Sequence, residues 1–207
     1  MKQQFGQKWN DKAKEYSYLK AADSQIAPFS FVRDLIENEL SSSEEVRILD
    51  VGCFTGAFAE KVSEYAETHT SIQIKYVGID ASDKVLKEAR NRINATANFQ
   101  PYWLQNDAYQ IDSIQQDLLA IDITSFDIIY FGGIFFYSRY EDSLAMLYAA
   151  RFQSKYILCA DTWRKNAANA YPNLTAKYGT MRAIDYKIEA NRNNNRILRL
   201  FHTHKTE

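Results

Sequence analysis

The stretch Ile48-Leu49-Asp50-Val51-Gly52-Cys53-Phe54-Thr55-Gly56 is the strongest indication of the fold of this chain. Its first four residues end a short apolar run, which is typical of a buried strand. Gly52 and Gly56 follow in a turn, where glycine allows a backbone conformation or a close approach that a Cβ would obstruct. Helical spacing of apolar residues begins at Ala57. We therefore predict a strand, a glycine turn and a helix start with exposed N–H groups, which favour an anionic group such as a carboxylate.

Outward from this stretch, strand and helix patterns alternate at lengths suited to βαβ units, which predict a doubly wound α/β fold with a mostly parallel sheet. Pro101 interrupts the third strand and places it at an edge. The last two strands are joined by an Asn-rich turn with no room for a crossover helix, so they form a C-terminal antiparallel hairpin. The predicted strands are 46–51, 72–79, 99–104, 126–131, 156–160, 183–190 and 196–204, and the predicted helices are 29–40, 57–67, 84–93 and 140–152.

Composition limits the classes of partner. A chain of 207 residues is long enough for one domain with a sizeable core. Its 25 basic and 26 acidic residues argue against a nucleic-acid partner, which usually requires a basic excess. Cys53 and Cys159 form no metal-ligand cluster and are expected to be reduced, buried thiols. The start lacks the apolar core of a signal peptide, and no apolar run is long enough to span a membrane, so we expect a soluble cytoplasmic protein.

Two further polar positions follow predicted strands. Asp80 ends Val77-Gly78-Ile79-Asp80, where a carboxylate can accept hydrogen bonds from both hydroxyls of a ribose. Its alternative role is a favourable charge at the start of the next helix. Asp107, within Asn106-Asp107-Ala108, can accept a hydrogen bond from the exocyclic amine of an adenine. Because Asn and Asp are also common in turns, a surface turn is the other interpretation.

The glycine spacing distinguishes two kinds of cofactor. A dinucleotide fingerprint requires glycines at its first, third and sixth positions, which hold Gly52, Phe54 and Ala57 here. Phe54 and Ala57 are not glycine, and the position of Phe54 is the one at which a glycine admits a pyrophosphate. A cofactor with a carboxylate and no phosphate makes less demand on this loop.

These residues together resemble a known family. Residues 48–56 resemble motif I of the class I S-adenosylmethionine-dependent methyltransferases, ILDVGCGTG, at every position except Phe54, which replaces the middle glycine. Asp80, Asp107 and Asp127 match the family's acidic positions after the second strand, near the adenine and at the fourth strand. The resemblance implies a Rossmann-like sheet of seven strands and S-adenosylmethionine as cofactor. The cofactor-binding residues it implies are Asp50, Gly52, Cys53, Phe54, Thr55, Gly56, Asp80, Ala81, Asn106, Asp107, Ala108, Phe131 and Gly132.

The reaction that the resemblance implies is an in-line displacement at the sulfonium methyl group. The protein would position the reactants and exclude water, and the sequence identifies no catalytic base or metal ligand. His69 is expected at the surface, and His202 and His204 are expected to be structural. No Asn/Asp-Pro-Pro-aromatic motif follows the fourth strand, which argues against methylation of exocyclic base amines.

We expect a small-molecule acceptor, N- or O-methylated. The alternatives are a protein or RNA acceptor, or a cofactor-binding scaffold that has lost catalysis, with Phe54 as its sign. Residues 1–40 are predicted to form a helical lid or substrate segment over a methyltransferase domain at 41–207, because the aromatic residues near the start have no place in the strand–helix alternation. The candidate acceptor-side residues are Tyr16, Tyr18, Tyr137, Asp161 and Trp163.

Overall fold

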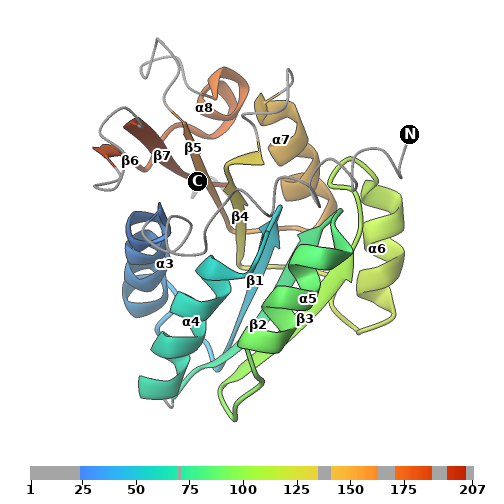
Figure 1. Ribbon diagram of the computed structural model, residues 1–207. Coiled ribbons are helices and arrows are strands. Elements are labelled where there is room, and N and C mark those ends of the chain that lie inside the picture. Colours follow the sequence, from blue (N-terminus) through green and yellow to red (C-terminus); the bar gives the residue numbers. More distant parts are fainter. Residues whose placement is uncertain (1–23, 70, 135–140, 163–170, 188–194, 204–207) are drawn as a thin grey trace.

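Seven strands pair into one sheet in the computed structural model (Figure 1). The structure describes residues 24–69, 71–134, 141–162, 171–187 and 195–203. The strands are β1 (Glu45–Val51), β2 (Gln73–Asp80), β3 (Phe99–Gln105), β4 (Ile128–Gly132), β5 (Tyr156–Thr162), β6 (Arg182–Lys187) and β7 (Asn195–His202). Their order across the sheet is β3-β2-β1-β4-β5-β7-β6. The predicted Rossmann-like, doubly wound fold is therefore confirmed, with β3 at an edge.

Strand direction divides the sheet into two parts. The pairs β1–β2, β1–β4, β2–β3 and β4–β5 are parallel. β7 is antiparallel to both β5 and β6, so the C-terminal hairpin is confirmed. Since β1 lies between β2 and β4, its carboxyl end meets the ends of both neighbours, where open α/β sheets bind ligands.

Helices cover both faces of the sheet (Figure 1). One face carries α3 (Ile26–Asn38), α4 (Ala57–Thr68) and α5 (Asp83–Arg92). The other carries α6 (Ile111–Leu119), α7 (Glu141–Arg151) and α8 (Pro172–Tyr178). Ser82 caps α5, because its hydroxyl accepts a hydrogen bond from the Val85 N–H at 3.4 Å. The helices α6 and α8 are short and were not predicted.

Two hydrophobic cores lie on opposite faces of the sheet. Successive side chains of β1 point into different cores. Ile48 lies in the core under α3 and α4, and Leu49 lies in the core under α6, α7 and α8. Asp50 shares the face of Ile48, since successive side chains of a strand point to opposite faces. This alternation places a carboxylate on the α4 side of the sheet, at the carboxyl end of its central strand.

The described part of residues 1–40 is α3, which packs into the first core through Phe31, Val32, Leu35 and Ile36. An ion pair joins Asp34 Oδ2 to Arg182 Nη1 of β6 at 2.5 Å. This helix therefore shares its core with the sheet. Residues 1–23 lie outside the described residues, and the lid remains a prediction. Every helix in the described ranges is too short or too polar to span a bilayer.

Candidate functional site

The glycine loop follows β1 and alternates residues of unusual backbone conformation. Gly52, Phe54 and Gly56 have φ angles of +80°, +52° and +78°. Glycine adopts this left-handed region at little cost, whereas for an L-residue with a side chain it costs roughly 1–2 kcal/mol. Phe54 therefore occupies a conformation that suits the glycine of the family motif. The substitution changes the side chain at this position and keeps the backbone turn.

Asp80 closes this loop against the end of β2. Its Oδ2 accepts a hydrogen bond from the Phe54 N–H at 3.1 Å, and its Oδ1 accepts one from the Ser82 N–H at 2.9 Å. Burial raises the pKa of Asp80 to about 6, although hydrogen bonds from the N–H groups of Ser82, Phe54 and Ala81 oppose that rise. The carboxylate predicted to hold a ribose is thus already fixed in orientation by the backbone around it.

Most backbone N–H groups of the glycine loop donate hydrogen bonds within the fold, in contrast to those predicted to be exposed at the start of the following helix. The N–H groups of Gly52 and Cys53 both donate to the carbonyl oxygen of Ile79, at 2.8 and 3.0 Å. The Phe54 N–H donates to Asp80, and the Gly56 N–H donates to Cys53 O at 3.1 Å. These N–H groups of the loop are therefore used in hydrogen bonds within the loop and to the end of β2. The N–H groups that attract an anion are then those of the first turn of α4, which have no intrahelical partner.

Asp50 is a buried carboxylate beside this loop, 1% exposed. Its Oδ2 accepts a hydrogen bond from the Tyr76 hydroxyl, and its Oδ1 has no hydrogen-bond partner among the described residues. Burial raises the pKa of Asp50 to about 7, the Tyr76 hydrogen bond lowers it and the charge of Asp80 raises it further. Thr55 Oγ1 is a second buried oxygen of the loop without a partner in the described ranges.

Trp103 of β3 fills space that two glycines leave open. A Cβ on Gly78 would lie 2.7 Å from the Trp103 ring and 2.9 Å from Cys53 Sγ. A Cβ on Gly56 would lie 2.7 Å from Ile93 Cδ1 and 3.2 Å from the Trp103 ring. Burial raises the pKa of the Cys53 thiol well above its usual range, which keeps it protonated. These residues form a close-packed floor beneath the loop.

The turn after β3 has the hydrogen bonds of an Asx turn, and the role of Asp107 toward an adenine stays a prediction. Asp107 Oδ1 accepts the Tyr109 N–H at 3.0 Å, as in an Asx turn. The Asn106 side-chain amide donates to Ser113 Oγ and Asp117 Oδ2, both at 2.9 Å, so it is directed at α6. The carbonyl oxygen of Ala108 accepts the Tyr148 hydroxyl of α7 at 2.7 Å. The turn is therefore held from both helices.

The end of β4 borders the loop on its other side. The Phe131 side chain is fully buried in the core under α7, with its ring 5.4 Å from that of Tyr148, so this residue can face a ligand only through its backbone. A Cβ on Gly132 would lie 2.7 Å from the Tyr130 hydroxyl. Asp127 lies at the opposite end of β4, where Oδ1 pairs with Lys155 at 2.8 Å. Asp127 is thus remote from the loop and structural.

Most of the candidate acceptor-side residues fall outside the described residues, namely Tyr16, Tyr18, Tyr137 and Trp163. Asp161 belongs to β5, where its backbone pairs with Ile197 of β7. His69 is exposed and stacks on Tyr65 with ring centroids 3.9 Å apart. His202 stacks on Tyr156 at 4.9 Å, as a structural residue would, and His204 is outside the described ranges.

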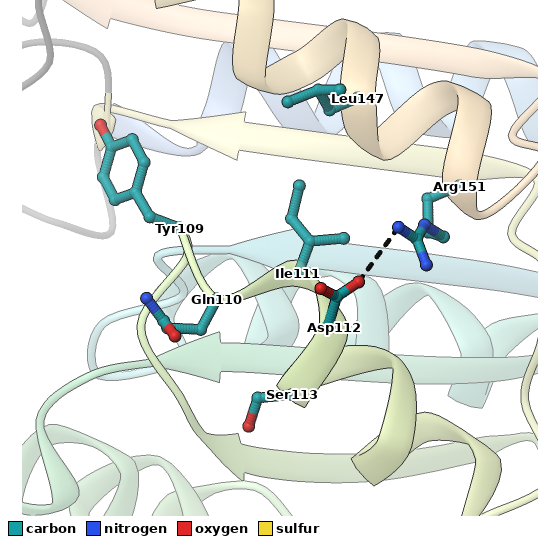
Figure 2. Close-up of a pocket in the computed structure, with 7 residues that line it drawn as sticks. All are labelled: Tyr109, Gln110, Ile111, Asp112, Ser113, Leu147 and Arg151. Carbon is teal, nitrogen blue, oxygen red and sulfur yellow. Dashed lines mark ion pairs between the residues drawn. The ribbon is translucent and has the colours of Figure 1, made fainter.

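A cavity of about 280 Å³ lies between the start of α6 and the side of α7. Figure 2 shows Arg151 of α7 directed at Asp112 of α6, with Nη2 3.0 Å from Oδ1. None of the predicted cofactor residues lines this cavity, although it begins one residue after Ala108. The lining residues are Tyr109, Gln110, Ile111, Asp112, Ser113, Leu147 and Arg151.

Sequence reasoning missed two residues that shape the site, Tyr76 and Tyr148. Both lie in apolar patterns that indicate burial and give no sign of a polar partner. A tyrosine in such a run is itself a signal, because a buried phenol usually needs a hydrogen-bond partner. The partners, Asp50 and the carbonyl of Ala108, belong to two of the predicted cofactor-binding segments.

Solved structures of several methyltransferases share this fold. Magnesium protoporphyrin IX methyltransferase from Synechocystis PCC 6803, solved with bound SAH, has a TM-score of 0.63 at 12% identity, covering 96% of each chain. Plantazolicin methyltransferase, in complex with SAH and a monoazolic desmethylPZN analog, has a TM-score of 0.56 at 14% identity, covering 98% of this chain and 95% of that one. An arsenic(III) S-adenosylmethionine methyltransferase from Chlamydomonas reinhardtii has a TM-score of 0.51 at 12% identity, covering 78% and 65%.

The sequence also matches a family described as a methyltransferase domain, over residues 49–153. This range is half of the chain and contains the glycine loop, Asp80 and the turn at 106–108. None of the curated proteins compared with the chain matches it. The family match and the seven-stranded sheet agree with each other and with the motifs. The chain belongs to the class I S-adenosylmethionine-dependent methyltransferases.

Proposed function

We propose that this chain methylates a small-molecule acceptor, on nitrogen or oxygen, with S-adenosylmethionine as the methyl donor. The observation that carries the small-molecule assignment is the balance of 25 basic and 26 acidic residues in a chain of one domain. Phosphate neutralisation in a nucleic-acid complex usually requires a basic excess. The segment at the end of β4, Gly132-Gly133-Ile134, also differs from the motif expected for methylation of base amines.

The residues around the loop fit the cofactor. Asp80, which the N–H groups of Phe54 and Ser82 hold in place, would accept hydrogen bonds from ribose hydroxyls, and Asp50 Oδ1 is a buried acceptor without a partner among the described residues. A buried unpaired carboxylate is costly, so a cationic group of a ligand is its natural complement. S-Adenosylmethionine carries an ammonium group for this acceptor, a carboxylate for the first turn of α4, and an adenine for the turn at 106–108. When bound, it supplies an electrophilic methyl group on sulfur.

The chain itself would bind and orient the reactants and exclude water. An acceptor that is a neutral amine or a thiolate needs no base. An acceptor hydroxyl needs a group that can take its proton, with a pKa near the working pH. The two described histidines are stacked on tyrosines at the C-terminal ends of α4 and β7, away from the glycine loop, so they do not fill this role.

We assign the cover of the acceptor site to residues 1–40. The described end of this segment supports the assignment. The Gln25 side chain, which directly precedes α3, accepts a hydrogen bond from the Tyr130 hydroxyl at 2.7 Å. Tyr130 pairs with Asp50 in the register of β4 and β1, close to the carboxyl ends of both strands. Gln25, near the start of the described part of this segment, therefore lies close to the sheet edge that carries the predicted cofactor residues.

An acceptor screen with S-adenosylmethionine labelled in its methyl group tests the proposed function. We expect label transfer to a small amine, hydroxyl or thiol compound and none to bulk RNA or to a protein mixture. Transfer to RNA or protein alone would overturn the small-molecule assignment. Cofactor binding without transfer to any class would favour a scaffold that has lost catalysis.

A further inference from the structure

Tyr76 lies in the middle of β2, fully buried, and its hydroxyl donates to Asp50 Oδ2. The strand register explains this contact. Tyr76 pairs with Ile48 and Gly78 pairs with Asp50, so Tyr76 and Asp50 are diagonal neighbours on one face. Rings on three sides fix the phenol, with centroids of Phe58, Phe99 and Trp103 at 6.5, 5.8 and 5.7 Å. The hydroxyl therefore has one fixed direction, toward the carboxylate.

The two oxygens of Asp50 consequently have different surroundings. Oδ2 is engaged by Tyr76, whereas Oδ1 is buried without a partner in the described structure. The titratable groups that act on this carboxylate or its hydroxyl partner are Tyr76 and Asp80 of β2, Cys53 of the loop and Tyr130 of β4. None of these groups is cationic. A buried carboxylate in such surroundings binds a cation or a proton.

We propose that Tyr76 is a positioning residue for cofactor binding: its hydroxyl fixes one oxygen of Asp50, so that the other is presented to the ammonium group of S-adenosylmethionine. This inference rests on the proposed placement of the cofactor beside the glycine loop. It assigns a function to a residue of β2 that lies outside the motif. It also couples binding to pH, because the ammonium group and a proton compete for the same carboxylate.

The direction of this coupling follows from the charges. With its pKa near 7, Asp50 is largely protonated in the free protein at lower pH and must lose that proton to pair with the ammonium group. Affinity for a ligand with the ammonium group therefore rises as pH rises through 7. Removing the Tyr76 hydroxyl removes a hydrogen bond that lowers the pKa of Asp50, so the rise moves to higher pH.

Two ligands distinguish the contribution of Asp50 to binding from that of the rest of the site. S-Adenosylhomocysteine carries the ammonium group, whereas 5′-methylthioadenosine has the same nucleoside without the amino-acid end. Both ligands present the ribose to Asp80, so the titration of Asp80 affects both affinities equally. The affinity for S-adenosylhomocysteine divided by that for 5′-methylthioadenosine therefore isolates the contribution of the amino-acid end. The experiment measures this ratio by calorimetry between pH 5.5 and 8 for the wild type, Tyr76→Phe and Asp50→Asn. Tyr65→Phe is the matched control, because it removes a phenol hydroxyl from the same core, about 13 Å along α4 from the glycine loop.

We expect the wild-type ratio to rise with pH and the ratio of Asp50→Asn to be low and flat. Tyr76→Phe should lower the ratio about tenfold at pH 7, the effect of a lost hydrogen bond to a charged group, and should shift the rise to higher pH. Tyr65→Phe should match the wild type. A ratio in Tyr76→Phe that equals the wild type, or that falls equally at every pH, would overturn the inference. Failure of the wild type to bind either ligand would instead contradict the proposed function.

Discussion

The backbone N–H of Phe54 donates a hydrogen bond to Oδ2 of Asp80, at 3.1 Å. This contact joins the two segments that the sequence marks as cofactor-binding, the glycine loop after β1 and the acidic end of β2. It also engages the backbone of Phe54, the residue that stands where the family motif has glycine. Phe54 adopts the left-handed conformation with φ +52°, and the hydrogen bond to Asp80 helps to hold it there. The loop therefore adopts, with a phenylalanine at its centre, a backbone conformation that glycine adopts most easily.

Replacing Asp80 with alanine is expected to weaken cofactor binding by about 1–3 kcal/mol, since charge-assisted hydrogen bonds to the ribose would be lost. Isothermal titration with S-adenosylhomocysteine measures the change. Asp83→Ala is the matched control, because Asp83 lies three residues away with its side chain 65% exposed and paired to Arg90. An unchanged dissociation constant in folded Asp80→Ala would place the ribose elsewhere.

The glycines of the loop should differ in their tolerance of alanine. Gly52 and Gly56 have nearly equal φ angles, so each substitution introduces a left-handed alanine at about 1–2 kcal/mol. At Gly52 the new Cβ would make an ordinary contact with Ile134 at 3.5 Å, whereas at Gly56 it would lie 2.7 Å from Ile93 Cδ1. We expect Gly56→Ala to lower the free energy of unfolding more than Gly52→Ala does. Urea denaturation tests this order, and equal losses would contradict the packing described around Gly56.

The raised pKa of Asp50 predicts a pH dependence of stability in the ligand-free protein. The folded state binds this proton with a pKa of about 7 and the unfolded state with one near 3.8, so Asp50 makes the protein less stable as pH rises from about 4 to 7. The amide side chain introduced by Asp50→Asn binds no such proton. The stability of this variant relative to the wild type should therefore increase over this range, by up to about 1.4 kcal/mol per pH unit. Urea unfolding of both proteins at several pH values measures the difference, and parallel curves would refute the assignment.

Deleting residues 1–20 tests the proposed cover of the acceptor site. The core that α3 shares with the sheet is retained, so the truncated chain should fold and bind S-adenosylhomocysteine. We expect a large loss of turnover, measured with an acceptor from the labelled-cofactor screen, because water would no longer be excluded. Unchanged turnover would end the lid proposal. Global unfolding would show instead that the segment stabilises the fold.

Much of the fold could be predicted because its central strands are buried on both faces. The runs around Ile48, Val77 and Ile129 are mostly apolar, and each is followed by a helical pattern, which favours parallel pairing. The hairpin followed from the lack of space for a crossover helix. The helix at Ile111–Leu119 was missed because only Ile114 and Leu118 are buried within a mostly polar sequence. Pro172–Tyr178 is a single short helix whose pattern buries one residue, Leu174.

The sequence predicted which residues lie at the candidate site, but it did not predict most of their hydrogen-bond partners. The motif located Asp50, the loop and Asp80 correctly at neighbouring strand ends. It could not indicate that the N–H groups of Gly52 and Cys53 are used by Ile79, because this depends on how far β2 extends past β1. The partner of Asp50 was also hidden, since it depends on the register that brings Tyr76 beside it. Local sequence determines which groups are present, and strand register determines which of them meet.

We propose that the glycine loop, Asp50 and Asp80 together bind S-adenosylmethionine. Calorimetric titration of the purified chain with S-adenosylmethionine, S-adenosylhomocysteine and NAD tests this assignment. The glycine spacing, with Phe54 at the position that admits a pyrophosphate, predicts that the first two ligands bind and that NAD does not. Binding of NAD alone would contradict the account.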